Sequence, residues 1–147
     1  MNKEELLSSL DKKGFGENIL NSFRIIKREN FLPEHLALYA YEDTALPLEE
    51  GAALSQPSTI AFMLSLLEIE KTNKILEIGS GSGYVLALLS ISASEGEIYG
   101  IEVNRTLALQ SKERLKDIER VHLIQRNGFR GLPEREPFDR ILISATC

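Results

Sequence analysis

A glycine-rich turn between a predicted strand and a predicted helix is the clearest chemical feature of the sequence. The apolar segment 74–78 leads directly into Gly79, Gly81 and Gly83, and a helical pattern follows. Glycine tolerates a positive φ angle, and without a Cβ atom its backbone can approach a ligand closely. Free N–H groups at the start of the following helix would point at that ligand. We therefore predict a cofactor-binding turn.

The spacing of these glycines differs from the dinucleotide-binding pattern G-x-G-x-x-G. The third glycine comes one residue early, and Tyr84 occupies the position that the pattern requires. The order E-x-G-x-G-x-G, which begins at Glu77, instead resembles the first motif of the S-adenosylmethionine-dependent methyltransferases. Because many proteins have a glycine-rich turn, the neighbouring residues must supply the rest of the evidence.

An acidic residue follows the turn at the spacing of a ribose-binding carboxylate. Glu102 ends the apolar segment 98–101, about twenty residues beyond the glycines, where such a carboxylate accepts hydrogen bonds from ribose hydroxyls. We expect Glu102 to bind a ribose. The alternative is a solvent-facing acid at the end of a strand.

Composition argues against several other kinds of site. The formal net charge of −5 disfavours non-specific binding of nucleic acid. The single cysteine, Cys147, can form neither a disulfide nor a cysteine metal site within one chain. The two histidines, His35 and His122, are far apart and lack the spacing of metal ligands. We expect no metal, and we interpret His122 as a structural histidine on a strand.

Length and hydropathy predict a single cytoplasmic domain. The chain has 147 residues, the usual size of one domain. No apolar stretch approaches membrane-spanning length, and the N-terminus lacks the apolar core of a signal peptide. We therefore expect a cytoplasmic protein that does not bind membranes.

Helical periodicity in the N-terminal part predicts three helices. Apolar residues recur at helical spacing over 3–12 and 17–28, and Arg28 would lie at the helix end that favours cations. Residues 32–57 form a long connection, and loops of this length are usually functional. Pro57 suits the first turn of a third helix. The apolar face of that helix would comprise Ile60, Met63, Leu64 and Leu67.

From residue 74 onward, predicted strands and helices alternate. The strands are expected at 74–78, 97–102, 121–125 and 139–144, with helices near 83–92 and 105–117. This alternation predicts a Rossmann-like, doubly wound α/β fold with a mainly parallel sheet of about four strands. We interpret the charge run 112–117 as a solvated helix face.

We expect one domain with two parts. Residues 1–72 would form an N-terminal helical and substrate-loop region, and residues 73–147 the cofactor-binding part. The chain ends directly after the last predicted strand, so the apolar run 141–143 would lie at an uncovered edge, which favours pairing with another chain. We interpret the chain as a truncated domain and expect dimers or aggregates through this strand.

Segments outside the glycine turn resemble the protein-L-isoaspartate O-methyltransferase family. Residues 28–34 resemble its F-(V/L)-P segment, and residues 41–47 resemble its Y-x-D-x-x-L-P motif. Residues 54–57 are similar to its I-S-Q-P signature, and residues 131–139 to its G-L-P-x-x-x-P-F-D segment. The resemblance covers nearly all of residues 17–145, and the Ser-Gln-Pro element is its most diagnostic part.

The resemblance implies a protein-repair activity. The enzyme would transfer a methyl group from S-adenosyl-L-methionine to the α-carboxylate of an L-isoaspartyl residue, which leaves S-adenosyl-L-homocysteine. A carboxylate is already ionised at neutral pH, so catalysis would depend on alignment and desolvation of the reactants. Ser55 is the expected catalytic residue, because its hydroxyl could donate to or orient the substrate carboxylate. Alternatively, Ser55 satisfies free N–H groups where the third helix begins.

The resemblance also suggests the cofactor-binding residues. Glu77 would orient the methionine end of the cofactor, and Gly79, Ser80 and Gly81 would contact the cofactor through their backbone. The backbone of Ala53 and Leu54 would line the same cleft, whereas Gly83 would only allow close helix packing. Asp43 either shapes the substrate loop or lies in a surface turn.

Two segments depart from the family pattern. Asn127-Gly128 stands where the family usually has Asp-Gly, whose carboxylate meets the adenine amino group. An amide oxygen is a weaker acceptor than a carboxylate; alternatively, Asn-Gly is simply a favoured turn dipeptide. Residues 49–53 replace a more glycine-rich, threonine-containing run, which affects the shape of the substrate pocket.

Two other functions stay open. The chain could be a methyltransferase for a small molecule or a nucleic acid, although its acidity and the Ser55 signature disfavour this. It could also be a truncated, inactive relative that still binds the cofactor. For the favoured function, the partners would be isoaspartyl-containing peptides and proteins.

Overall fold

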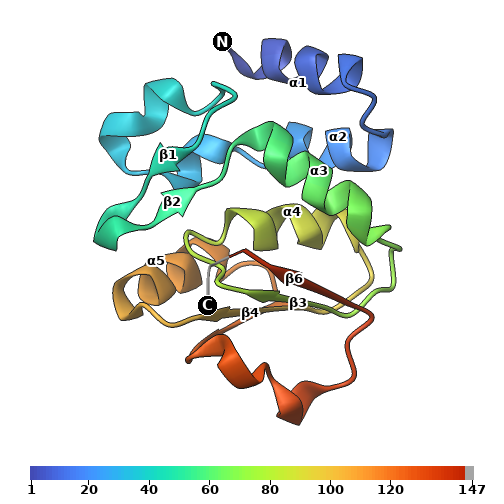
Figure 1. Ribbon diagram of the computed structural model, residues 1–147, viewed down its shortest axis with the longest axis vertical. Helices are drawn as coiled ribbons and strands as arrows, with labels where there is room; N and C mark the ends of the chain where they lie inside the picture. Colours follow the sequence, from blue (N-terminus) through green and yellow to red (C-terminus); the bar gives the residue numbers. More distant parts are fainter. Residues whose placement is uncertain (145–147) are drawn as a thin grey trace.

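Four parallel strands form the central sheet. They are β3 (Ile75–Ile78), β4 (Ile98–Glu102), β5 (Val121–Gln125) and β6 (Arg140–Ile143). In the computed structural model, which describes residues 1–144, they lie in the order β5-β4-β3-β6. Figure 1 labels three of these neighbours, β4, β3 and β6. The predicted Rossmann-like α/β fold with a parallel four-stranded sheet is confirmed. Cys147 lies outside the described residues.

The strand order creates a topological switch point between β3 and β6. The chain runs outward from β3 through β4 to β5 and then crosses back to the other side of β3. Ile78 pairs with Ile143, and the N–H of Ser144 donates to the carbonyl oxygen of Ile78 (2.9 Å). Ligands of open α/β sheets bind outside the carboxyl ends of the strands at such a point.

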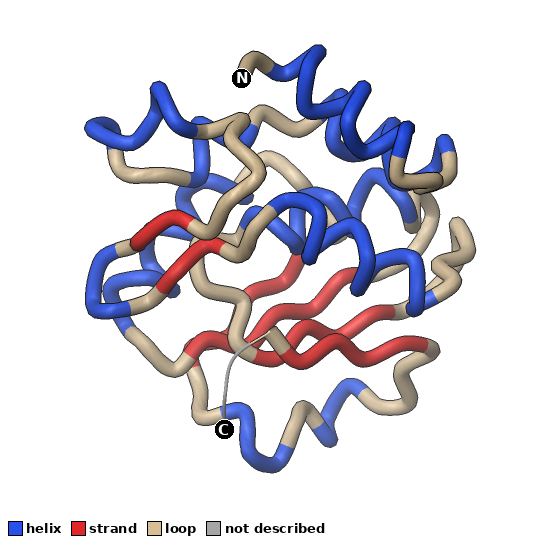
Figure 2. Tube along the Cα trace, turned by 45° about the horizontal axis from the view of Figure 1, so that its top comes forward, coloured by secondary structure: helices blue, strands red, loops and turns tan. Residues whose placement is uncertain are grey.

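Helices cover one face of the sheet (Figures 1 and 2). Their bounds are α1 Lys3–Lys12, α2 Glu17–Ile25, α3 Pro57–Leu67, α4 Tyr84–Ser92 and α5 Arg105–Leu115. The α2 helix packs on α4, α1 packs on α2, and α3 contacts both α2 and β6. Because α4 is covered on both sides, all of its residues from Tyr84 to Ser90 are buried, and its sequence is apolar all round.

The opposite face of the sheet is covered by the connection between β5 and β6 (Figure 2). This connection contains two short 3₁₀ helices, η4 (Gly128–Arg130) and η5 (Pro133–Arg135). It places Leu132 against Leu76, Tyr99 and Ile101, which together form a second, smaller buried cluster. No helix within residues 1–144 is long and apolar enough to span a membrane.

The long connection that the sequence indicated is largely structured. It contains the 3₁₀ helices η2 (Glu34–Tyr39) and η3 (Glu49–Gly51), and a third, η1 (Arg28–Phe31), lies directly before it. Two short antiparallel strands, β1 (Leu46–Pro47) and β2 (Ala53–Leu54), form a hairpin around η3. The hairpin leads directly into α3, so it fixes the approach of the Ser-Gln-Pro segment to the sheet.

One sequence-based expectation about a helix end is wrong, and two others agree with the structure to within two residues. The second helix stops at Ile25, because the backbone of Ile26 is already extended, with ψ 128°. Arg28 therefore does not close that helix; it is fully buried in η1. The helix after the glycine turn begins at Tyr84, because Gly83 adopts the left-handed conformation (φ 90°). Finally, α5 ends at Leu115 rather than at residue 117.

Candidate functional site

The glycine turn is anchored to the end of β4. The N–H groups of Gly79 and Ser80 both donate to the carbonyl oxygen of Ile101, at 2.8 and 3.0 Å. Gly79 and Gly81 have φ angles of 81° and 55°, a region that side-chain-bearing residues rarely adopt. The turn therefore needs glycine at these positions to hold its shape over the strand ends.

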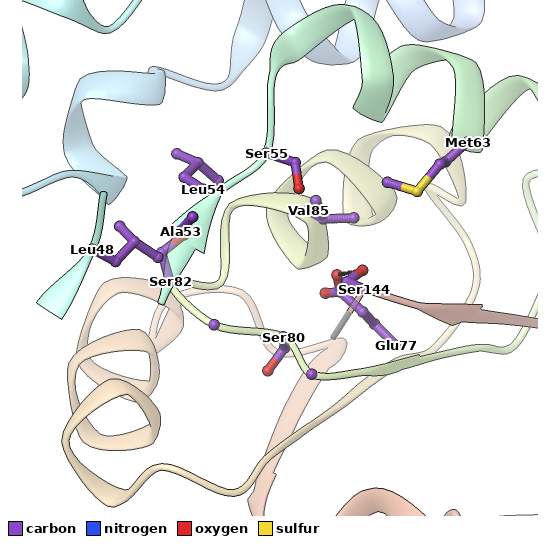
Figure 3. A pocket seen from close by; sticks show the side chains of 12 residues that line it. Leu48, Ala53, Leu54, Ser55, Met63, Glu77, Ser80, Ser82, Val85 and Ser144 are labelled. Atoms are coloured by element: carbon purple, nitrogen blue, oxygen red, sulfur yellow. Dashed lines mark hydrogen bonds between the residues drawn. The ribbon is translucent and has the colours of Figure 1, made fainter. Parts of the chain in front are cut away.

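A pocket lies at the switch point between β3 and β6. It is lined by Leu48, Ala53, Leu54, Ser55, Met63, Glu77, Gly79, Ser80, Gly81, Ser82, Val85 and Ser144 (Figure 3). The cavity measures about 40 Å³, which is room for a few atoms rather than for a whole nucleotide. Seven of the predicted site residues line this single pocket: Ala53, Leu54, Ser55, Glu77, Gly79, Ser80 and Gly81.

The Ser55 side chain faces the pocket across from Glu77 (Figure 3). Its hydroxyl makes no hydrogen bond within residues 1–144, although its backbone carbonyl accepts one from Arg28. The alternative role, satisfying the free N–H groups of α3, falls to another residue. Asp43 Oδ1 accepts the N–H of Ser58 in the first turn of α3 at 2.8 Å. The Ser55 hydroxyl thus remains available to a ligand.

Glu77 is a buried acid at the end of β3. Its side chain is 1 % exposed, and Oε2 accepts a hydrogen bond from the Ser144 hydroxyl at 2.5 Å. Oε1 is buried without a partner among residues 1–144. Burial raises the pKa of Glu77 to about 8, and the nearby Glu102 charge adds to the shift, while the Ser144 hydrogen bond opposes it. An unpaired buried carboxyl oxygen suits a cationic ligand group.

Glu102 connects β4 to the glycine turn. It is nearly buried, 7 % exposed, so the alternative of a solvent-facing acid is wrong. Its two carboxylate oxygens accept the N–H groups of Gly81 and Asn104, each at 2.8 Å. Each oxygen can accept a second bond, so these contacts leave capacity for hydroxyl groups of a ligand.

Asn127 and Gly128 lie after β5 and outside the pocket lining. The Asn127 Oδ1 atom accepts the N–H of Phe129 at 2.9 Å, which is the capping role typical of a turn residue. A Cβ atom on Gly128 would lie 2.5 Å from Ile78 Cγ2, so the loop packs directly on the end of β3. The Arg126 N–H donates to the Glu102 carbonyl oxygen, which joins this loop to β4.

Sequence reasoning missed several residues at the site. Leu48, Met63, Ser82, Val85 and Ser144 line the pocket but carry no local motif of their own. Arg114 was expected on a solvated face, yet it is half-buried and donates to the Ser82 carbonyl oxygen at 3.2 Å. Only its neighbours in the charge run are exposed. These contacts join segments far apart in the chain, so no spacing signal could have revealed them.

Gly83 packs tightly, as expected. A Cβ atom there would lie 2.9 Å from Leu115 Cδ1 and 3.0 Å from Ser111 Cβ, both on α5. The third glycine of the motif therefore brings α4 and α5 together rather than lining the pocket.

Comparisons with known proteins agree over the whole chain. The sequence profile of the family described as protein-L-isoaspartate(D-aspartate) O-methyltransferase (PCMT) matches residues 1–147. A protein-L-isoaspartate O-methyltransferase of Opitutus terrae is 40% identical over 131 residues, covering 88% of this chain and 55% of the relative. One of Ignicoccus hospitalis is 35% identical over 150 residues, covering 99% of this chain and 71% of the relative.

A solved protein-L-isoaspartate O-methyltransferase structure has the same fold. It superposes with a TM-score of 0.88 and 32% sequence identity, covering 97% of this chain and 48% of that one. The chain thus spans about half the length of this structure and of the Opitutus relative.

Proposed function

The chain belongs to the protein-L-isoaspartate O-methyltransferase family, and we propose that it methylates the α-carboxylate of L-isoaspartyl residues in damaged proteins. The methyl donor would be S-adenosyl-L-methionine, the cofactor of this family. One observation carries the proposal: the unpartnered Ser55 hydroxyl faces the same switch-point pocket as the glycine turn. Carboxyl methylation needs this juxtaposition of donor and acceptor sites.

The residues around the pocket fit such a cofactor. Glu77 and Ser80 each have a buried side-chain oxygen without a partner among residues 1–144, so both can bind a polar ligand group. We propose that Glu77 and the backbone of Gly79, Ser80 and Gly81 hold the methionine end. When bound, the cofactor supplies a methyl group on a sulfonium, which is a good leaving group.

Three residues beyond the pocket would hold the adenosine part. Each carboxylate oxygen of Glu102 accepts one backbone N–H, from Gly81 or Asn104, and can accept a second hydrogen bond. Glu102 would accept these second bonds from the ribose hydroxyls. Asn127 and the backbone of Gly128 would meet the adenine, and the Asn127 amide oxygen, already capping Phe129, can accept a second bond. These strand-end positions match the switch-point rule for α/β sheets.

Ser55 would bind the substrate carboxylate. Its hydroxyl donates to one carboxylate oxygen and thereby directs the other toward the donor. No general base is needed, because the carboxylate is ionised at neutral pH. The backbone of Ala53 and Leu54 would line the cofactor in the same cleft, and Leu48, Met63 and Val85 would exclude water from the reacting atoms.

Several broader expectations remain part of the proposal. Residues 1–72 would supply the substrate side and residues 73–147 the cofactor side of one domain; both parts contribute to one buried core, for example through Phe23 and Leu86. The partners would be isoaspartyl peptides and proteins in the cytoplasm. The protein would also self-associate through β6.

The test is transfer of a labelled methyl group from S-adenosyl-L-methionine to an isoaspartyl peptide. We expect a base-labile methyl ester on this peptide and none on the same peptide with a normal aspartyl residue. Ser55→Ala should abolish most of the transfer while leaving S-adenosyl-L-homocysteine binding intact, because the glycine turn and Glu102 remain. Cofactor binding without transfer would identify an inactive relative, and transfer to a nucleic acid or metabolite would identify another methyltransferase.

A further inference from the structure

Arg28 is a buried cation to which the proposed function assigns no role. Its side chain is fully buried, 0 % exposed, and it forms no ion pair within residues 1–144. Burying a charge without a counter-charge is unfavourable unless hydrogen bonds or aromatic rings compensate. Burial lowers the pKa of the guanidinium, although the nearby Asp43 charge opposes this shift. The groups around Arg28 must therefore stabilise its buried charge.

The contacts of Arg28 lead to the reacting serine. Nη2 donates to the backbone carbonyl of Ser55 at 3.1 Å and to that of Thr44 at 3.4 Å. The guanidinium carbon lies 5.2 Å from the ring centroid of Tyr84, within the range of a cation–π interaction. Among residues 1–144, Nε and Nη1 have no hydrogen-bond partner, and both carbonyl contacts come from Nη2. Arg28 thus links η1, the segment before β1, the segment before α3 and the start of α4.

A second contact joins the segment before β1 to the start of α3. Asp43, the neighbour of Thr44, accepts the N–H of Ser58 at 2.8 Å. The segment before β1 is therefore tied to the start of α3 on both sides of the Gln56-Pro57 step. Tyr84, the ring that Arg28 covers, immediately follows Gly83 of the glycine turn. Arg28 therefore connects the Ser55 carbonyl to the Tyr84 ring, and these two contacts help to set the position of Ser55 relative to the glycine turn.

Within residues 1–144, the Ser55 hydroxyl makes no hydrogen bond that fixes its direction. The backbone of Ser55 sets the direction of the Cα–Cβ bond, and rotation about that single bond then leaves the hydroxyl three staggered positions. Arg28 holds the carbonyl of that residue, and through it the peptide plane. A planar guanidinium can hold two carbonyls and stack on a ring at once, which an ammonium group cannot do equally well.

We propose that Arg28 is a positioning residue, which fixes the Ser55 peptide and thereby aims the Ser55 hydroxyl at the transferable methyl group. This inference rests on the proposed function. Arg28 touches neither substrate nor cofactor; it acts through Ser55. Misplacing a reacting group by about 1 Å can slow a reaction ~100-fold, so removal of Arg28 should mainly affect kcat.

A double-mutant cycle between Arg28 and Ser55 tests this inference. Arg28→Met should lower kcat for isoaspartyl methylation ~100-fold, with an unchanged dissociation constant for S-adenosyl-L-homocysteine in calorimetry. Arg28→Lys should restore part of the rate. In a Ser55→Ala background, Arg28→Met should have little further effect, because both changes remove the same contribution. Fully additive effects, or a loss of cofactor affinity alone, would overturn the proposal.

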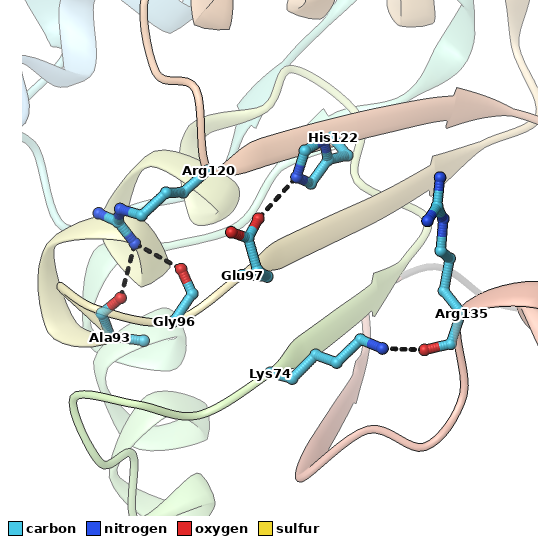
Figure 4. A network of polar contacts seen from close by, with 7 residues as sticks. All are labelled: Lys74, Ala93, Gly96, Glu97, Arg120, His122 and Arg135. Atoms are coloured by element: carbon cyan, nitrogen blue, oxygen red, sulfur yellow. Dashed lines mark hydrogen bonds and ion pairs between the residues drawn. The ribbon is translucent and has the colours of Figure 1, made fainter.

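Arg120 provides a matched control. Its guanidinium also donates to backbone carbonyls, those of Ser90, Ala93 and Gly96, at 2.7 to 2.8 Å. The contacts with Ala93 and Gly96 lie between the end of α4 and the start of β4 (Figure 4), and neither Arg120 nor any of these three partners lines the pocket. Arg120→Met should lower the melting temperature without changing kcat. If it lowers kcat as much as Arg28→Met does, the effect of Arg28 is merely structural.

Hydrogen–deuterium exchange separates this proposal from the proposed function. Arg28→Met should speed exchange in residues 41–58 but not in the glycine turn, and Arg120→Met should leave 41–58 unchanged. If the parent protein methylates no isoaspartyl peptide but exchange changes as expected, the proposed function is wrong. The restraint of residues 41–58 by Arg28 is then still supported. Unchanged exchange in 41–58 contradicts the positioning role whether or not the protein is active.

Discussion

At the scale of single residues, Glu77 is the group whose charge state most affects the site. Burial holds the pKa of this carboxyl at about 8, so in the ligand-free protein Glu77 retains its proton at neutral pH. A cationic ligand group beside it favours the ionised form and lowers that pKa. Binding of the methionine end should therefore be linked to release of the Glu77 proton.

We predict that S-adenosyl-L-homocysteine binds more tightly as the pH rises from about 6 to about 8. Calorimetry at neutral pH in two buffers of different ionisation enthalpy should detect proton release on binding. Glu77→Gln should bind more weakly and show no release. If the parent protein and Glu77→Gln release equal numbers of protons, Glu77 is not the linked group.

The raised pKa of Glu77 also predicts how the stability of the ligand-free protein depends on pH. The folded-state pKa of Glu77 is raised from 4.5 to about 8, so between these pH values the folded protein binds the proton and the unfolded chain does not. The contribution of this group to stability is fully present below pH 4.5 and is lost as the pH rises toward 8. Urea unfolding should show a smaller decrease in stability with pH for Glu77→Gln than for the parent. An equal decrease in both proteins would contradict the shift.

A further prediction about a single residue concerns Glu102. Glu102→Ala should weaken S-adenosyl-L-methionine binding by ~1.5–3 kcal/mol, the usual value for lost charge-assisted hydrogen bonds. Because Glu102 also holds the N–H groups of Gly81 and Asn104, Glu102→Gln is the matched control. This substitution removes the charge, but the amide oxygen of glutamine can keep one of the two backbone contacts. An unchanged dissociation constant for Glu102→Ala would exclude Glu102 from the cofactor site.

Residue types and spacing predicted some of these groups but not others. Glu102 and the glycine turn follow from a strand that ends in a turn, with an acid at a fixed distance. Ser55 came from family resemblance, because a serine before Gln-Pro has several ordinary uses. Arg28 and Ser144 were not predicted, since their partners, Ser55 and Glu77, lie 27 and 67 residues away in the chain.

At the scale of elements, the junction of α4 and α5 depends on Gly83. Its φ of +90° is unfavourable for alanine, and the added Cβ would also contact Leu115. Gly14 is a suitable control, because its φ is +91° and a Cβ there would meet nothing within 4 Å. Both positions carry backbone strain, but only Gly83 is crowded.

We predict that Gly83→Ala destabilises the protein by ~1–3 kcal/mol more than Gly14→Ala does, the usual effect of overpacking. Chemical denaturation of both variants measures this difference. Gly83→Ala should also weaken cofactor binding, since α4 begins directly after the turn. Equal destabilisation by the two substitutions would mean that α5 moves to accommodate the methyl group.

Element types were more predictable than element ends. The strands from 74 onward are short, apolar and rich in branched residues, and they alternate with helical periods, so the parallel α/β class followed from the sequence. The ends of α2 and α5 and the five 3₁₀ helices did not follow, because tertiary contacts decide them. Arg28 shows the reason: its position in the sequence suits a helix end, but its charge is stabilised by carbonyls and by a ring from other segments.

At the scale of the whole molecule, β6 forms one edge of the sheet. Ile141 and Ile143 of this strand are 53% and 57% exposed. An exposed apolar edge strand favours pairing with another chain. We predict that the protein of residues 1–147 self-associates with rising concentration and that Ile143→Lys reduces this association. Light scattering that finds a monomer at all concentrations would contradict the prediction.

We propose that one pocket, at the switch point between β3 and β6, brings the methyl donor to Ser55. The most direct test is a crystal structure of the protein with S-adenosyl-L-homocysteine and an isoaspartyl peptide. We predict the cofactor sulfur over the turn of Gly79 to Gly81, with the Ser55 hydroxyl in hydrogen-bond contact with the substrate carboxylate. A cofactor bound elsewhere, or a substrate carboxylate out of reach of Ser55, would contradict the account.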